Sequence, residues 1–433
     1  MTNILFKFVG LLLAILTPVL TILTTDITVP FDKEVQTVQE KAGGFIKGVC
    51  HADPDYELIK DANIDWFRDD IPFPFTKDGE LSPSYISWKE YAKGYVDKGI
   101  RIFGITPYPE DFMEYGLDPR DPADKEGIQE IARFYVEDLR DIVGAFQITN
   151  EMGVDRFTYP LTMEEARDFI GMQLEAMYPV KGDILIGYNL AAQSLAPPNI
   201  LPLMMRDYHK YCDYVGLDLY LGCFEPVLKN ANQYMTVLNI VRLLTGKPII
   251  LCEFGYIGLG EPKSNAEKKA ILQKYGYNSE KEARENIDAF IGNLPEDLRN
   301  EFDRYADETP EYRANLMFDG EFSNHLYCEL QDGFGIYGFP HTPEGQANFF
   351  SYIIPKLRRM NFVVGTIVYC WSDSGDCYVC GQEECPVETK WGLVDNEGNP
   401  KPAYYAVKKA FSDVKEFDFE IGDKRFEVSI SNK

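Results

Sequence analysis

FQITNEMG, residues 146–153, begins as an apolar run and changes abruptly to a carboxamide and a carboxylate. The apolar part is typical of a buried strand, and Asn150 and Glu151 lie where that strand leaves the core. A carboxylate at the edge of a core is costly unless it is paired. The stretch therefore indicates a buried strand and raises the question of a partner for Glu151 elsewhere in the chain.

Eight short apolar runs of this kind follow one another along the chain. They are continuous rather than alternating and rich in Ile, Val, Leu and Tyr, as expected for parallel strands buried on both faces. The runs are FIKGV (45–49), IDWF (64–67), IRIFGI (100–105), AFQIT (145–149), DILIGY (183–188), YVGLDLY (214–220), PIILC (248–252) and GTIVYC (365–370).

Longer amphipathic stretches separate these runs, and several of them carry helix-start signals. The signals are capping boxes at Thr162-x-x-Glu165, Ser264-x-x-Glu267 and Ser279-x-x-Glu282, and Thr342 before a proline. Strands that alternate with helices predict an α/β fold, a (β/α)8 or TIM barrel. A doubly wound open sheet is the alternative, although no glycine-rich phosphate motif follows the first strand.

One connection in this pattern is much longer than the others. Residues 259–335, between the runs at 248–252 and 365–370, are highly charged and helix-prone, and they predict a helical insertion after the seventh strand. An insertion there rises from the face that carries barrel active sites, so it is either a lid or subsite wall, or a helical subdomain without a role in the site. After residue 412, FDFEIGDKRFEVSI (417–430) predicts a short C-terminal β-hairpin around Gly422 and Asp423.

The first 25 residues differ in character from the rest. MTNILFK is followed by FVGLLLAILTPVLTILTT, one long apolar stretch after a single early lysine. A signal peptide and an N-terminal membrane anchor fit equally well, and a buried core helix fits less well because the stretch is apolar on all sides. Either of the first two predicts an extracellular protein, secreted or membrane-anchored, with residues 26–433 as the folded domain.

Composition limits the partners. Hydrophobic residues make up 45% of the chain and aromatic residues 14%, which is enough for a sizeable core. The formal net charge is -26, so the surface repels nucleic acid and anionic lipid and suits neutral or cationic ligands.

The chain has nine cysteines, of which Cys377, Cys380 and Cys385 form a polar C-x2-C-x4-C cluster. In an exported protein such a cluster first suggests a disulfide-stapled loop, which is our expectation here. Free thiols are the second interpretation. A structural metal site is the third, because the surrounding sequence has neither a second C-x-x-C nor a nearby histidine.

Polar and aromatic residues follow most of the predicted strands, at the barrel face where active sites lie. In chain order they are Arg68, Tyr108, Asn150, Glu151, Asn189, Tyr220, Glu253 and Trp371. Each alone carries little weight, because an acid after a strand is usually a solvated loop residue. Together they place two carboxylates, Glu151 and Glu253, across one barrel mouth.

Two carboxylates facing each other across a pocket are what cleavage of a glycosidic bond requires. One protonates the leaving oxygen, and the other attacks the anomeric carbon or activates water. A divalent-metal site is the competing interpretation, but it would need more aspartates or histidines at the rim, where His51 is the only histidine near a strand end.

These segments resemble a large clan of retaining glycoside hydrolases built on (β/α)8 barrels. FQITNE is similar to the clan's fourth-strand motif, and GKPIILCEFGY (246–256) to its seventh-strand motif. Further similar segments are DWFRDDIPF (65–73), DYVGLDLY (213–220), VYCWSD (368–373) and the closing segment WGLVDNEGNPKPAYYAVKKAF (391–411). The resemblance covers about residues 43 to 411 apart from the insertion, and Met152 stands where several of the families carry proline.

The resemblance implies that Glu151 is the acid/base and Glu253 the nucleophile of a retaining β-glycosidase that acts on an oligo- or polysaccharide. Arg68, Asn150, Tyr220 and Trp371 would then shape the subsite for the attacked sugar. The reaction needs no metal or organic cofactor. Two alternatives stay open: a cell-surface barrel that binds carbohydrate without cleaving it, and a transglycosylase that uses the same residues.

Overall fold

The computed structural model describes residues 32–52, 55–195, 199–224, 229–260, 262–320, 322–330, 335–383, 385–412, 416–421 and 424–429. The predicted leader or anchor, residues 1–25, lies outside this part of the chain. In the described part, no helix is both long and apolar enough to cross a membrane.

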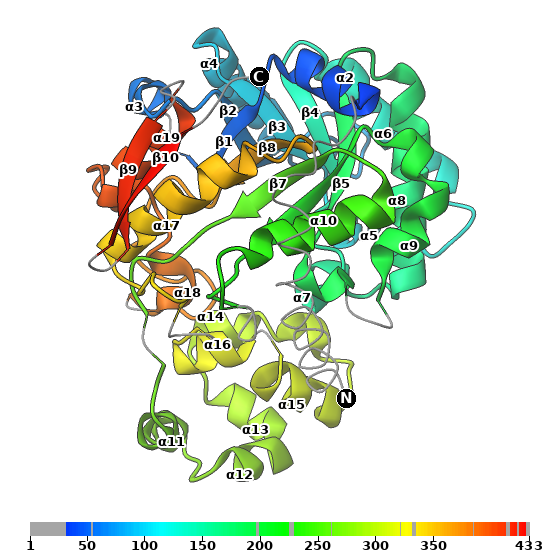
Figure 1. The fold of residues 1–433 in the computed structure, drawn as a ribbon. Coiled ribbons are helices and arrows are strands. Elements are labelled where there is room, and N and C mark those ends of the chain that lie inside the picture. The colour runs from blue at the N-terminus through cyan, green and yellow to red at the C-terminus, as the bar shows by residue number, and fades with distance from the viewer. Residues whose placement is uncertain are drawn as a thin grey trace.

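Eight parallel strands close into a barrel, which confirms the predicted (β/α)8 fold (Figure 1). Each strand pairs with the next, and β8 pairs with β1, so the open doubly wound sheet is excluded. The strands are β1 (Ile46–Cys50), β2 (Trp66–Asp70), β3 (Arg101–Ile105), β4 (Val143–Ile148), β5 (Leu185–Leu190), β6 (Tyr214–Leu219), β7 (Ile249–Phe254) and β8 (Val363–Val368). Every one overlaps its predicted run, because strands buried on both faces need continuous apolar sequence.

Helices surround the barrel between these strands (Figure 1). Before β7 they are α2 (Lys33–Ala42), α3 (Tyr56–Asp61), α4 (Pro83–Asp97), α5 (Pro109–Tyr115), α6 (Lys125–Asp138), α7 (Asp155–Thr158), α8 (Met163–Met177), α9 (Leu201–Met204) and α10 (Gln233–Thr245). The predicted capping boxes of Thr162 and Ser264 are both present. At Ser279 only half of the box forms, because Glu282 accepts from the backbone of Asn278 instead.

Between β7 and β8 the chain forms a lobe of short helices at one end of the barrel, the end where α7 also lies (Figure 1). The lobe holds α11 (Asn265–Lys274), α12 (Glu280–Glu285), α13 (Ile287–Gly292), α14 (Glu296–Asn300), η5 (Asp303–Tyr305), α15 (Pro310–Phe318) and α16 (Phe322–Tyr327), and the barrel helix α17 (Pro343–Leu357) follows. Thr342 caps α17 as predicted.

The lobe contacts the loops that follow β3 and β4. Arg156 of α7 donates to Glu301 (3.3 Å), and Arg304 donates to the backbone oxygen of Arg156 (3.0 Å). Arg304 also forms an ion pair with Glu110 of α5 (3.5 Å). These loops belong to the carboxyl-terminal face of the barrel, so the lobe borders the face that carries barrel active sites.

After β8 come α18 (Pro386–Thr389) and α19 (Pro402–Phe411), and then two antiparallel strands, β9 (Glu416–Ile421) and β10 (Lys424–Ser429). Residues 422 and 423, the predicted hairpin turn, lie outside the described residues.

Candidate active site

Arg68 of β2 is the centre of a buried polar network at the barrel mouth. Its side chain is 1% exposed, and it donates from Nη1 to Oε1 of Glu253 (2.5 Å). It also donates from Nε to Gln147 (3.0 Å) and from Nη2 to Asn150 (2.8 Å). The guanidinium thus connects β2 to β7 and to β4. A charge this deeply buried must have such partners.

Asn150 is held in one orientation by its neighbours. Its Oδ1 accepts from Arg68, from Gln147 Nε2 (3.0 Å) and from Asn189 Nδ2 (2.6 Å). Because three donors converge on this atom, it must be the amide oxygen. The other terminal atom of the amide, Nδ2, is therefore available as a donor. Asn150 is therefore oriented to present a hydrogen-bond donor.

The backbone at the end of β4 adopts an unusual conformation around Asn150. Thr149 (φ 53°) and Glu151 (φ 44°) both lie in the left-handed region, which side chains other than glycine rarely adopt. The conformation is held by the bond from Thr149 N to Thr106 Oγ1 (3.0 Å) and the bond from Glu151 N to Asn189 Oδ1 (2.9 Å). Such strain costs about 1–3 kcal/mol per residue and gathers at functional sites.

Glu151 lies at the mouth itself, half-buried, while the next residue, Met152, is fully buried in the core. The side chain of Glu151 acts on the same network electrostatically. After burial and the charge of Glu253, its negative charge is a further cause of the raised pKa values of Asp218 and Tyr220. Glu151 and Glu253 therefore belong to one electrostatic cluster.

Glu253 at the end of β7 is 7% exposed and has a donor on each oxygen. Arg68 donates to Oε1, and the Tyr220 hydroxyl donates to Oε2. Burial and the charge of Glu253 raise the pKa of Tyr220 well above its usual value, so the phenol keeps its proton and remains a donor. The two contacts fix the carboxylate in a single orientation.

Asp218 of β6 is a member of the network that sequence reasoning missed. It is 2% exposed, its Oδ2 accepts from Asn189 Nδ2 (2.5 Å), and its Oδ1 has no partner among the described residues. Burial, and then the charge of Glu253, raise the pKa of Asp218 well above its ordinary value. The sequence signal that could have indicated Asp218 is a lone acid in GLDLY (216–220), a stretch that is otherwise apolar.

Aromatic rings pack around Tyr220. Its ring centroid lies 5.2 Å from Trp391 and 5.9 Å from Tyr369, and Phe224 stacks on Trp391 at 5.8 Å. The Tyr369 hydroxyl donates to Glu388 of α18 (3.1 Å), and burial raises the pKa of Glu388 to about 8. Neither Tyr369 nor Trp391 was predicted as a site residue.

The structure does not bring Trp371 into this group, although the sequence predicted it there. Its ring is 2% exposed and meets the ring of Tyr404 in α19 edge-on at 6.2 Å. The reason is where the strand ends: β8 stops at Val368, so Tyr369 is the aromatic residue at the mouth. Trp371 comes after the chain has turned toward α19.

The cysteine expectation was also wrong. All nine cysteines lie in the described part of the chain and none of them is paired in a disulfide, so the expected disulfide is not formed. Cys377, Cys380 and Cys385 instead lie together with His325, which is distant in sequence. Within the described residues this is the group that could hold a metal ion, and the mouth carboxylates do not form another.

Comparison with known proteins finds similarity in structure alone. No protein-family model and no curated protein matches the chain. The GH53 catalytic domain of Ignisphaera aggregans is 14% identical, with a TM-score of 0.53 over 86% of this chain and 97% of that one. That likeness shows the same barrel fold.

Two further structures match less closely. The GH2 β-galacturonidase of Eisenbergiella tayi bound to galacturonate is 13% identical, with a TM-score of 0.47 over 86% of this chain and 52% of that one. A family 39 glycoside hydrolase from Bacteroides cellulosilyticus is 13% identical, with a TM-score of 0.48 over 87% of this chain and 65% of that one. The chain thus spans about half the length of the galacturonidase.

Proposed function

We propose that the protein is a retaining glycoside hydrolase that cleaves β-glycosidic bonds. The observation that carries the proposal is Glu253 at the end of β7, which is held by Arg68 and Tyr220. The same hydrogen-bonded network runs from Arg68 through Asn150 and Asn189 to the backbone of Glu151 at the end of β4. The GH53 catalytic domain has the same barrel fold, which is compatible with the proposal.

In the first step, Glu253 attacks the anomeric carbon while Glu151 gives a proton to the leaving oxygen, which forms a glycosyl-enzyme ester. In the second step, Glu151 takes a proton from water, which attacks the ester and releases the sugar with its original anomeric configuration. Arg68 and Tyr220 orient Glu253 for attack, because each donates to one of its oxygens.

Two side chains contribute to the proposed subsite for the attacked sugar. Asn150 presents Nδ2, which suits a sugar hydroxyl beside the anomeric carbon. Tyr369, which is only partly buried, offers an aromatic face to the C–H side of a pyranose, the role that the sequence assigned to Trp371. The lobe of α11–α16 borders the same face and is proposed as a wall for further sugar units.

The partner is therefore a neutral oligo- or polysaccharide rather than nucleic acid, in keeping with a net charge of -26. We also propose that residues 1–25 direct the protein out of the cytoplasm, as a cleaved signal or as a membrane anchor. Cell fractionation with N-terminal sequencing of the mature chain separates these outcomes.

The test of the function is turnover of a panel of aryl β-glycosides by the wild type, Glu253→Gln and Glu151→Gln. We expect wild-type turnover on at least one sugar and a loss of about 10³-fold or more in kcat in Glu253→Gln. Azide should restore turnover by Glu151→Gln on substrates with a good leaving group. Such substrates need no proton donor for the first step, and azide attacks the glycosyl-enzyme ester in the second step without a general base.

The matched control is Asp213→Asn, which removes a partly buried carboxylate paired with Lys181 (2.7 Å) just before β6, at the opposite end of the barrel. Its kcat should stay close to that of the wild type. Binding of oligosaccharides without turnover of any substrate would favour the non-catalytic barrel. Sugar transfer in place of hydrolysis would favour the transglycosylase.

A further inference from the structure

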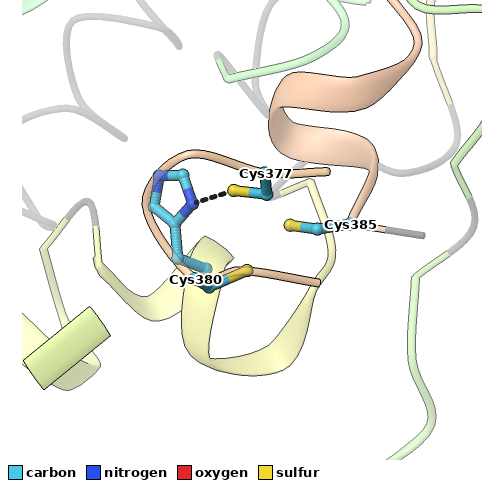
Figure 2. A group of neighbouring side chains, drawn as sticks. Cys377, Cys380 and Cys385 are labelled. Carbon is cyan, nitrogen blue, oxygen red and sulfur yellow. Dashed lines mark hydrogen bonds between the residues drawn. The ribbon is translucent and has the colours of Figure 1, made fainter. Parts of the chain in front are cut away.

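The lobe after β7 meets the loop after β8 through sulfur and nitrogen side chains that the proposed reaction does not use. His325 comes from α16 of the lobe, and Cys377, Cys380 and Cys385 come from the loop between β8 and α18. Figure 2 shows the three cysteines pointing into one common space. We propose that these four residues form a structural Zn²⁺ site that fastens the lobe to the barrel.

The spacing of the four ligand atoms fits one metal ion. All four lie within 4.8 Å of one another, and His325 Nδ1 is 3.4 Å from Cys377 Sγ (Figure 2). In a tetrahedral zinc site with Zn–S bonds of about 2.3 Å, neighbouring sulfurs lie about 3.8 Å apart. The side chains therefore need only small rotations to close around zinc.

A tight turn brings the two sulfurs of the C-x2-C pair to the same side. Gly381 N donates to the backbone oxygen of Cys377 (2.7 Å), and Cys377 N donates to that of Gln382 (3.1 Å). Gly381 has φ 66°, a conformation that favours glycine directly after Cys380. Cys385 N then donates to the same Gln382 oxygen (3.3 Å), which folds the third sulfur back toward the pair.

Burial favours a metal over free thiols. His325 is 7% exposed, and the three cysteines are at most 1% exposed. Their side chains converge on each other rather than packing separately among apolar residues, which is how a buried thiol without a ligand normally lies. Zinc is the first-row ion that three thiolates and one imidazole at tetrahedral spacing suit best.

A fifth group lies at the edge of the site. Cys328, three residues after His325, has its sulfur 4.0 Å from that of Cys380. It lines a hollow of about 540 Å³ together with Lys263, Gly381, Gln382 and Glu383, next to the turn that follows Cys380. Lys263 donates to the backbone oxygen of Cys328 (3.1 Å), so a positive charge stands beside the net negative site.

The site is placed to influence the barrel mouth through one short segment. α18 begins directly after Cys385 and carries Glu388, which accepts from the Tyr369 hydroxyl. Tyr369 in turn lies against Tyr220, the donor to Glu253. Zinc at this point would hold α18 and Tyr369 in position without touching the substrate.

The first test measures metal content in the full chain, and it does not depend on the proposed activity. We expect about one equivalent of zinc per chain after purification from zinc-supplemented cells. Replacement by Co²⁺ should give thiolate-to-cobalt charge-transfer bands and the intense visible bands of a tetrahedral site. Zinc-free protein, or disulfides among Cys377, Cys380 and Cys385 by mass spectrometry, would overturn the proposal.

Variants then locate the metal. Cys385→Ser should lose the zinc and the cobalt bands, whereas Cys212→Ser, a buried cysteine before β6, should keep both. His325→Asn should weaken zinc binding about 100-fold or more, and Cys328→Ser should leave it nearly unchanged. The reverse order for the last two variants would overturn the assignment of His325 as the fourth ligand.

Discussion

Arg68 holds several buried side chains at the barrel mouth, among them Glu253 and Asp218, so its loss should affect stability as well as catalysis. Arg68→Met leaves Glu253 buried with one of its two donors gone, and breaking a buried charge pair in this way costs about 3–5 kcal/mol. Chemical denaturation of the variant should show a loss in this range. Arg120→Met removes an exposed pair with Asp118 and should change the free energy of unfolding by less than about 1 kcal/mol. Similar losses in the two variants would contradict the network described here.

Asp218 should make stability depend on pH. Burial and the charge of Glu253 raise its pKa in the folded protein well above its usual value. A carboxyl of this kind favours the folded state at low pH, and the benefit is lost as the pH rises from its unfolded pKa of about 3.9 through its folded pKa. Asp218→Asn does not titrate, so its Tm should rise relative to that of the wild type as the pH increases above about 4. If the Tm values of the two proteins change in parallel with pH, Asp218 is ionised in the folded protein.

Single residues at strand ends could be placed from the sequence, because a strand's last residue fixes which groups reach the mouth. Arg68, Asn150 and Glu253 lie together in one hydrogen-bonded network as that reasoning placed them. Asp218 was missed because it lies inside the strand rather than at its end. Trp371 was misplaced because β8 ends at Val368, and an apolar run does not show where a strand stops.

At the scale of elements, the lobe after β7 should depend on its few polar contacts with the loops of the barrel. Arg304→Ala removes both the bond to the Arg156 backbone and the ion pair with Glu110. We expect faster proteolysis within the lobe, because looser docking exposes its short helices more often. Lys281→Ala, which removes an exposed pair with Glu285 inside the lobe, is the matched control and should be cut at the wild-type rate. Equal cutting of all three proteins would show that these contacts do not dock the lobe.

The eight strands were predictable as elements because each is a continuous apolar run buried on both faces. The group of His325 with Cys377, Cys380 and Cys385 was not, because its histidine lies in the lobe and its cysteines in the loop after β8. Local spacing shows a C-x2-C pair, but only the folded chain shows which distant helix supplies the fourth group. The disulfide expectation failed for the same reason.

At the scale of the whole molecule, a closed barrel places the ends of β4 and β7 at one mouth, and the two glutamates owe their shared electrostatic cluster to that closure. The long connection between β7 and β8 adds a lobe to the same end (Figure 1). The molecule thus combines a barrel with a helical lobe, which we propose as the wall for further sugar units.

Trapping the glycosyl-enzyme intermediate would show most directly whether Glu253 is the nucleophile. A 2-deoxy-2-fluoro glycoside of the preferred sugar slows both steps, and a reactive leaving group lets the covalent ester accumulate. Mass spectrometry of the digested protein should then find the sugar on Glu253. The product formed from the ordinary substrate, without fluorine, should keep that substrate's anomeric configuration. A label on another carboxylate, or inversion at the anomeric carbon, would contradict the account.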